Sequence, residues 1–183
     1  MTQVSASLVG MPEYIIRLVK ERLSDVNLES KWNALDTLQD PITQETELVD
    51  LSFPRGGYLV KTLPVFDGRN RFPALSVFIT GYREHEDQQG VHPDIYEYDL
   101  SVQIADKTLM SIEGLDPRDS LHQRVLRHAE AVRTTVLEDP TFGSRFSILR
   151  LEEVALSDVI ESVQDSLIQF VTLDFTVITG HGA

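Results

Sequence analysis

The sequence has no cysteine among its 183 residues. It therefore excludes disulfide bonds, a thiol nucleophile and any zinc site with cysteine ligands. It also has no apolar run near the roughly 20 residues that cross a bilayer, so we expect no membrane-spanning segment. The first twenty residues lack the basic start, apolar middle and small-residue cleavage site of a secretory signal. We therefore expect the chain to stay inside the cell that makes it.

Positive charge is scarce as well. The chain has 16 Lys and Arg residues against 29 Asp and Glu, a formal net charge of -13. Because phosphate binding depends on clustered Lys and Arg, this balance argues against a strong nucleic-acid binder. A chain of this length can bury about 70% of the surface that its unfolded form exposes. We predict one soluble domain, residues 1–183, with flexible ends at 1–11 and 180–183.

The sequence motifs of common catalytic sites are missing too. No Gly-x-Ser-x-Gly sequence occurs that would place a nucleophilic serine on a strained turn. The runs Pro54-Arg55-Gly56-Gly57 and Asp67-Gly68-Arg69 are shorter than a phosphate-binding loop, and we interpret them as turns.

Two segments have the spacing of amphipathic helices. Pro12 suits the first turn of a helix, and apolar residues recur every three or four positions from Glu13 to Val26. Asp116-Pro117 opens a second helix that runs to about Glu138. Its apolar stripe consists of Leu121, Val125, Ala129, Val132 and Val136. Between the two helices, residues 27–50 predict a short helical turn followed by an acidic loop at 36–50.

Five segments have the features of strands. They are residues 58–63, 72–82, 95–105, 145–155 and 167–179. A polar stretch, residues 83–94, connects the second and third, which predicts an antiparallel hairpin with a long loop. Because strands and helices do not alternate regularly, we predict an α+β fold. The expected architecture is a mostly antiparallel sheet flanked by the N-terminal helix and a second, central helix.

The loop at 83–94 holds residue types that bind zinc, manganese or iron. It contains His85 and His92 together with the carboxylates Glu84, Glu86, Asp87 and Asp94. The two histidines are seven residues apart in a polar loop, a spacing that matches no known metal motif. A solvated acidic hairpin tip explains these residues, and a metal-dependent enzyme using His85 and His92 is the alternative.

The central helix carries the main concentration of positive charge. Arg118, Arg124, Arg127 and Arg133 alternate with acidic residues. These arginines suit either an acidic partner surface or a salt-bridged solvent face. His122 and His128 lie six residues apart, so they project from different sides of the helix, and we expect both to be partly exposed.

Four segments together resemble the tail terminator (tail completion) proteins of long-tailed bacteriophages. They are residues 72–79 (Phe-Pro-Ala-Leu-Ser-Val-Phe-Ile), 96–106 (Tyr-Glu-Tyr-Asp-Leu-Ser-Val-Gln-Ile-Ala-Asp), 121–133 (Leu-His-Gln-Arg-Val-Leu-Arg-His-Ala-Glu-Ala-Val-Arg) and 137–143 (Leu-Glu-Asp-Pro-Thr-Phe-Gly). The likeness covers most of residues 12–179 and extends, less specifically, to neighbouring neck and head-tail joining proteins. The acidic segments at 27–50 and 83–94 look long for a compact ring subunit.

The resemblance implies a structural virion protein with no enzymatic activity and no cofactor. Such proteins assemble in the host cytoplasm as a hexameric ring on the tail tube, end tube polymerisation and offer a surface for head-tail joining. The implied partners are other copies of the chain, the tail-tube protein and a neck or head-completion protein. DNA passes through the ring without specific binding, and no membrane is involved.

For a ring, the sequence offers two sets of candidate surfaces. The first is a ring or tube interface formed by Tyr58, Val60, Arg118, Arg124 and Arg127, with residues 58–63 as a short edge strand. The second is acidic: the loop residues Glu84, Glu86, Asp87 and Asp94, or residues 36–50, facing the lumen or a partner. An acidic lumen would repel phosphate and let DNA slide. Carboxylates kept for solubility are the alternative. A monomeric cytosolic binding module is the remaining alternative for the whole chain.

Overall fold

Three helices and six strands make up the described part of the chain. The computed structural model describes residues 11–38, 52–55, 57–61, 71–84, 95–110, 116–162 and 165–179. In chain order the elements are α1 (Pro12–Arg22), α2 (Asp25–Leu35), β1 (Leu59–Lys61), β2 (Ala74–Glu84), β3 (Tyr96–Leu109), α3 (Pro117–Leu137), β4 (Ile148–Leu156), β5 (Ile160–Ser162) and β6 (Ser166–Thr179). This is a single α+β domain, as predicted.

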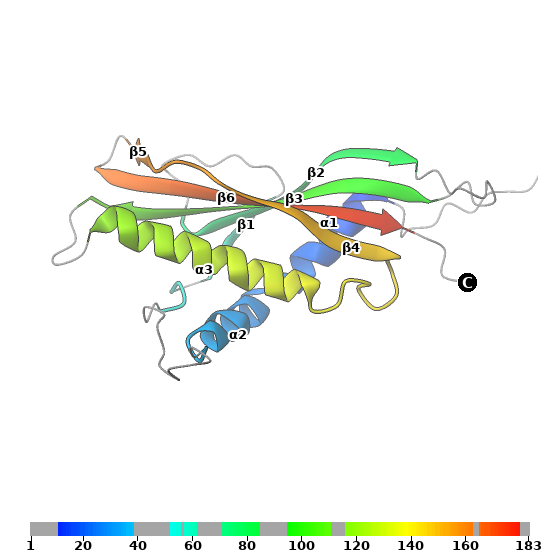
Figure 1. Ribbon diagram of the computed structural model, residues 1–183, viewed down its shortest axis with the longest axis horizontal. Coiled ribbons are helices and arrows are strands. Elements are labelled where there is room, and N and C mark those ends of the chain that lie inside the picture. Colours follow the sequence, from blue (N-terminus) through cyan, green and yellow to red (C-terminus); the bar gives the residue numbers. More distant parts are fainter. Residues whose placement is uncertain are drawn as a thin grey trace, which may run out of the picture.

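The strands form one sheet in the order β1-β2-β3-β6-β4, with β5 also beside β6 (Figure 1). β2, β3, β6, β4 and β5 pair in antiparallel fashion, which confirms the predicted hairpin between β2 and β3. β1 pairs in parallel with the first three residues of β2. The two longest strands, β3 and β6, therefore lie in the middle of the sheet.

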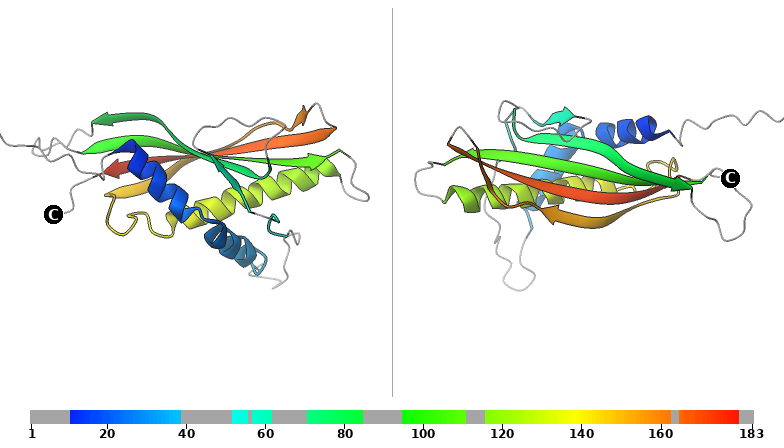
Figure 2. Two further views of the ribbon diagram at one scale, coloured as in Figure 1. Left: turned by 180° about the vertical axis from the view of Figure 1, so that it is seen from behind. Right: turned by 90° about the horizontal axis from the view of Figure 1, so that it is seen from above.

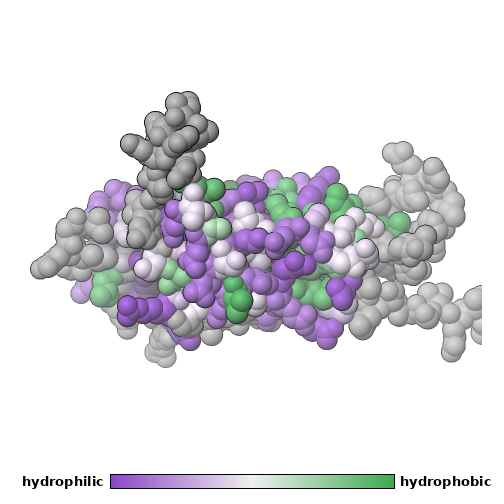
Figure 3. All heavy atoms as spheres, turned by 90° about the horizontal axis from the view of Figure 1, so that it is seen from below, coloured by the Kyte–Doolittle hydropathy of each residue, from purple (hydrophilic) through white to green (hydrophobic). Residues whose placement is uncertain are grey.

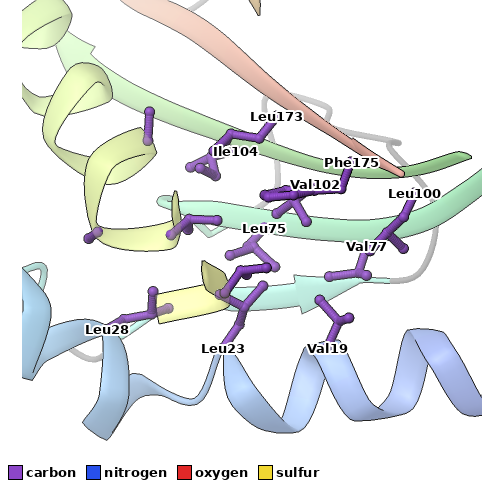
Figure 4. Packing of buried hydrophobic residues seen from close by; sticks show 14 of the residues in the cluster. Val19, Leu23, Leu28, Leu75, Val77, Leu100, Val102, Ile104, Leu173 and Phe175 are labelled. Atoms are coloured by element: carbon purple, nitrogen blue, oxygen red, sulfur yellow. The ribbon is translucent and has the colours of Figure 1, made fainter. Parts of the chain in front are cut away.

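All three helices lie on one face of this sheet (Figures 1 and 2). The side chains that point toward them are the core of the protein: Leu75 and Val77 from β2, Leu100, Val102 and Ile104 from β3, and Leu173 and Phe175 from β6 (Figure 4). Because side chains alternate along a strand, their neighbours face the other way. On that face Ser101 donates to Asp174 over 2.5 Å, and Gln103 donates to Thr172 over 3.2 Å. Within the described ranges no helix covers this second face.

The central helix α3 has the predicted start, stripe and end. The Asp116 carboxylate accepts the backbone N–H of Arg118 over 2.9 Å and so caps the first turn. After the helix, the Asp139 carboxylate accepts the backbone N–H of Gly143 over 2.6 Å, and Gly143 has a φ of +67°. The whole predicted apolar stripe is buried: Leu121, Val125, Ala129, Val132 and Val136.

The N-terminal helical region differs from its prediction. The expected single helix from Glu13 to Val26 ends at Arg22, and Ser24 has an extended backbone with ψ of 152°. A second helix, α2, begins at Asp25 and buries Leu28 and Trp32 completely, where only a short turn was predicted. The break turns α2 so that Trp32 enters the core, while Val26, expected on the apolar stripe, is exposed.

The remaining predictions hold in part. The strand predicted at 58–63 is present as β1 at one edge of the sheet, and the strand predicted at 145–155 is β4. The short strand β5 was not predicted. The ends 1–10 and 180–183 and most of both acidic loops, 39–50 and 85–94, lie outside the described residues.

The surface on the helix side is mostly hydrophilic, with separate hydrophobic patches between charged side chains (Figure 3). None of the helices in the described ranges is long and apolar enough to cross a membrane.

Candidate functional site

Four polar side chains meet beneath the sheet, between β3 and α3. They are Tyr58, which directly precedes β1, Asp106 of β3, and Arg124 and His128 of α3, and we call them the polar cluster. Tyr58, Asp106 and His128 are buried, and Arg124 is about a quarter exposed. Buried polar groups cost free energy unless they are hydrogen-bonded, so the bonding of the cluster decides its role.

Hydrogen bonds join the cluster in one chain. The Tyr58 hydroxyl contacts Nδ1 of His128, whose Nε2 lies 3.3 Å from Oδ2 of Asp106. Arg124 Nε donates to the same Asp106 oxygen over 2.8 Å. Because a carboxylate only accepts, a neutral His128 carries its proton on Nε2, donates it toward Asp106, and accepts a hydrogen bond from the Tyr58 hydroxyl at Nδ1. Every member of the polar cluster then has a partner.

The same contacts perturb the two acids of the cluster. Burial, and then the negative charges of Asp106 and Asp25, raise the pKa of the Tyr58 hydroxyl well above its usual value. Burial also acts to raise the pKa of the Asp106 carboxyl. The hydrogen bonds from His128 and Arg124, together with the positive charge of Arg124, outweigh burial, so the pKa of Asp106 is lowered. The cluster therefore holds a neutral tyrosine next to an ionised aspartate.

Aromatic rings and a second ion pair enclose the cluster. The Trp32 ring centroid lies 4.8 Å from that of His128, and Phe53 stacks edge-on against both Trp32 and Tyr58 at 5.9 Å. Arg127 lies over the Trp32 ring and pairs with Asp36 at the end of α2. These contacts connect α2 and the segment before β1 to α3.

In chemical terms, a Tyr-His-Asp chain could pass a proton. A catalytic group must also reach a substrate, and His128 has no exposed surface at all. The Tyr58 hydroxyl points to His128 and away from solvent. In the described ranges no group of three His, Asp or Glu side chains could hold a metal ion. The geometry of the polar cluster is that of a buried hydrogen-bond network that connects α3 to β3 and to the segment before β1.

A groove of about 610 Å³ lies along α1, beside the polar cluster, and shares Tyr58 with it. Its apolar surface comes from residues such as Ile16, Leu23 and Tyr58. Charged residues of both signs line it too: Glu13, Arg17, Lys20 and Glu21 of α1, and Asp25 at the start of α2. The Asp25 carboxylate also accepts the backbone N–H of Tyr58 over 3.0 Å, so this wall of the groove is attached to the polar cluster.

The candidate interface residues from the sequence lie in three places. Tyr58 and Arg124 belong to the polar cluster, and Arg127 is buried beside it. Arg118 is exposed at the start of α3 and pairs with Glu161 over 2.6 Å. Val60 lies in β1, opposite Leu75 of β2.

Of the acidic residues predicted to face the lumen or a partner in the 83–94 loop, only Glu84 lies within the described residues. Glu84 is the last residue of β2, paired with Tyr96 across the hairpin. Glu86, Asp87 and Asp94, together with His85 and His92, lie outside the described residues.

The burial of two members of the polar cluster, His128 and Asp106, was not predicted from the sequence. His128 was expected to be partly exposed, and this was wrong because position 128 continues the buried stripe of α3 between Val125 and Val132. Asp106 continues the inward-facing alternation of β3 after Ile104. A polar residue in phase with an apolar face was the available signal for both.

Two comparisons with known proteins found no match: no protein-family model matches the chain, and no curated protein matches it. The fold and the closed polar cluster define the protein as a single α+β domain whose buried polar groups hold its layers together.

Proposed function

We propose that the protein is a structural virion protein of a long-tailed bacteriophage: a tail terminator that caps the tail tube as a hexameric ring. In this role it ends tube polymerisation and provides the surface for head-tail joining. It has no enzymatic activity, is assembled in the host cytoplasm and remains in the neck of the virion. The sequence resemblance motivates the proposal, and the fold is of the kind that the resemblance implies.

The observation that carries the proposal is the construction of the sheet. In the described part of the chain, helices cover one face only. Among the described strands, β4 pairs only with β6, β1 pairs only with β2, and residues 77–84 of β2 pair only with β3. Edge strands are normally short, charged or covered, because free backbone groups invite pairing with another chain. Two different open edges on one chain suit head-to-tail association, which closes into a ring when the rotation between copies allows it.

The charge of the chain suits the same role. A formal net charge of -13 on every copy would give an assembled ring a strongly negative potential. DNA phosphates would be repelled and not bound, as a conduit for DNA requires. The carboxylates of the 83–94 and 36–50 segments are our candidates for the lumen or for the surface that meets a partner.

Two measurements test the proposal. In multi-angle light scattering over a range of concentrations, we expect a species near six times the 20.7 kDa of one chain, alone or with the tail-tube protein of the same genome. In electron microscopy, rings should sit at one end of assembled tubes and stop their growth.

Three outcomes would contradict the proposal. A monomer at every concentration that leaves tube growth unchanged would point to a cytosolic binding module. Rings that bind a head-completion protein but not the tube would indicate a neighbouring neck protein. Stoichiometric zinc or manganese in the purified protein would support the metal-dependent enzyme.

A further inference from the structure

β4 is an unusual edge strand because it is long and partly apolar. It has nine residues and pairs only with β6 among the described strands. Val154 and Leu156 lie opposite Leu173 and Val171, so they face the helix side, yet they are 42% and 40% exposed. Apolar side chains on the helix side of the sheet are normally buried in the core. Here the described helices of the same chain leave them partly uncovered.

The opposite edge of the sheet offers a strand of matching length. β1 covers only residues 74–76 of β2, so residues 77–84 pair with β3 alone within the described ranges. Figure 2, right, places α1 next to β2 on the side away from β3. The groove on α1, lined by Ile16, Leu23 and Tyr58, therefore lies beside this edge and on the helix side.

The order of strands determines how the two edges could meet. β4 runs antiparallel to β6, β6 to β3, and β3 to β2, so β4 and β2 run in opposite directions. A second copy in the same orientation would bring its β4 antiparallel to the open part of β2, with its helices on the same side. Val154 and Leu156 of the second copy would then lie toward the groove on α1.

The two edges also carry opposite charge. Residues 148–162 contain Glu152, Glu153, Asp158 and Glu161 against one arginine, Arg150. On the other edge, Arg55 and Arg71 are exposed before β1 and β2, and Arg71 donates to the carbonyl of Gly57 over 3.3 Å. This holds the two arginine-bearing segments close together. Antiparallel pairing would place Asp158 and Glu161 near these arginines, whereas parallel pairing would bring Arg150 there.

We propose that a second copy of this chain adds its β4 to residues 77–84 of β2, antiparallel, with Val154 and Leu156 over the groove on α1. The contact is head-to-tail and continues the sheet from one copy to the next. It rests on the proposed ring function, for which it supplies the subunit interface. The formal charge of each edge selects the partner and the direction of pairing.

A proline substitution in β4 tests the pairing directly. Ser157 donates its backbone N–H to Phe170, so by alternation the N–H of Val154 points away from β6. Val154→Pro removes that outward donor without breaking the β6 ladder, and proline is tolerated on edge strands. We expect self-association, followed by light scattering and sedimentation, to weaken by about tenfold or more. The control Val154→Ile keeps the donor and the apolar surface and should assemble normally.

A charge exchange keeps the test valid if the proline variant misfolds. Asp158→Lys with Glu161→Lys should weaken assembly, as should Arg55→Glu with Arg71→Glu. All four substitutions in one chain should restore it, which a mere folding defect cannot do. Circular dichroism and thermal unfolding check the fold of each variant.

The outcomes separate this inference from the proposed function. Rings that cap tubes but are unaffected by Val154→Pro and by both charge reversals would overturn the β4–β2 interface and leave the proposed function standing. An unmodified chain that neither self-associates nor binds tubes would overturn both.

Discussion

Replacing Tyr58 with phenylalanine should destabilise the protein far more than the same substitution at Tyr82. Both changes remove one hydroxyl oxygen and keep the aromatic ring. The Tyr58 hydroxyl contacts Nδ1 of His128 inside the polar cluster, and His128 has no exposed surface. Tyr82 is 67% exposed, so water replaces whatever its hydroxyl contacts.

The expected magnitude follows from the nitrogen that is left behind. Without the Tyr58 hydroxyl, Nδ1 of His128 has lost its partner in a site that water does not reach. An unsatisfied buried acceptor costs about 1–3 kcal/mol, so we expect a loss near 2 kcal/mol. For a domain of this size that lowers the melting temperature by about 4–8 °C. The Tyr82→Phe control should stay within about 0.5 kcal/mol of the unmodified protein.

Urea unfolding followed by tryptophan fluorescence measures this difference. Trp32 is the single tryptophan, and its ring lies 4.8 Å from that of His128, so its emission reports on the cluster itself. The slopes of the unfolding curves should be equal among the three proteins, and the midpoints should differ. Equal losses in the free energy of unfolding for Tyr58→Phe and Tyr82→Phe would refute the view that the polar cluster is a buried hydrogen-bond network that stabilises the fold.

Two further predictions concern Asp106 of the polar cluster and Gly57, which directly precedes Tyr58. The lowered pKa of Asp106 means that its stabilising contribution is complete above the unfolded pKa and is lost as pH falls through the folded pKa. As the pH falls from about 5 to about 3, the free energy of unfolding of Asp106→Asn, measured by urea titration, should therefore fall less than that of the unmodified protein. The same pH dependence for both proteins would contradict this. Gly57 and Gly143 both have positive φ, but an added Cβ meets Asp25 at 1.9 Å in the first case and Arg145 at 3.3 Å in the second. Gly143→Ala should cost about 1 kcal/mol and Gly57→Ala clearly more, as thermal unfolding will show; equal costs would be evidence against the Asp25 contact.

Local patterns were sufficient for most of the elements. The helix α3 could be predicted because a proline start, an aspartate cap and a five-residue apolar stripe all lie within one segment. The strands β3 and β6 could be predicted because their alternation continues over many residues. The boundary between α1 and α2 could not, because the apolar spacing continues past Leu23 while the backbone changes direction at Ser24. The helix that follows this break, α2, buries Leu28 and Trp32.

The candidate site depended on contacts between distant residues. Tyr58 and His128 are separated by 70 positions, and His128 and Asp106 by 22. Each residue on its own has an ordinary interpretation: an edge-strand tyrosine, a helix histidine, a strand aspartate. The phase of Asp106 and His128 with their buried apolar neighbours could have indicated burial, but not which partner each would find.

The amino-acid sequence by itself determined the α+β class, the positions of the long strands and the central helix, and the acidic character of the chain, since these follow from composition and short-range periodicity. Only the tertiary structure decided the order β1-β2-β3-β6-β4, the parallel pairing of β1, and which of the described strands pair on one side only. It also decided that Tyr58, Asp106 and His128 meet. The physical reason is that strand order and buried hydrogen bonds depend on which distant surfaces exclude water together, and no segment carries that information alone.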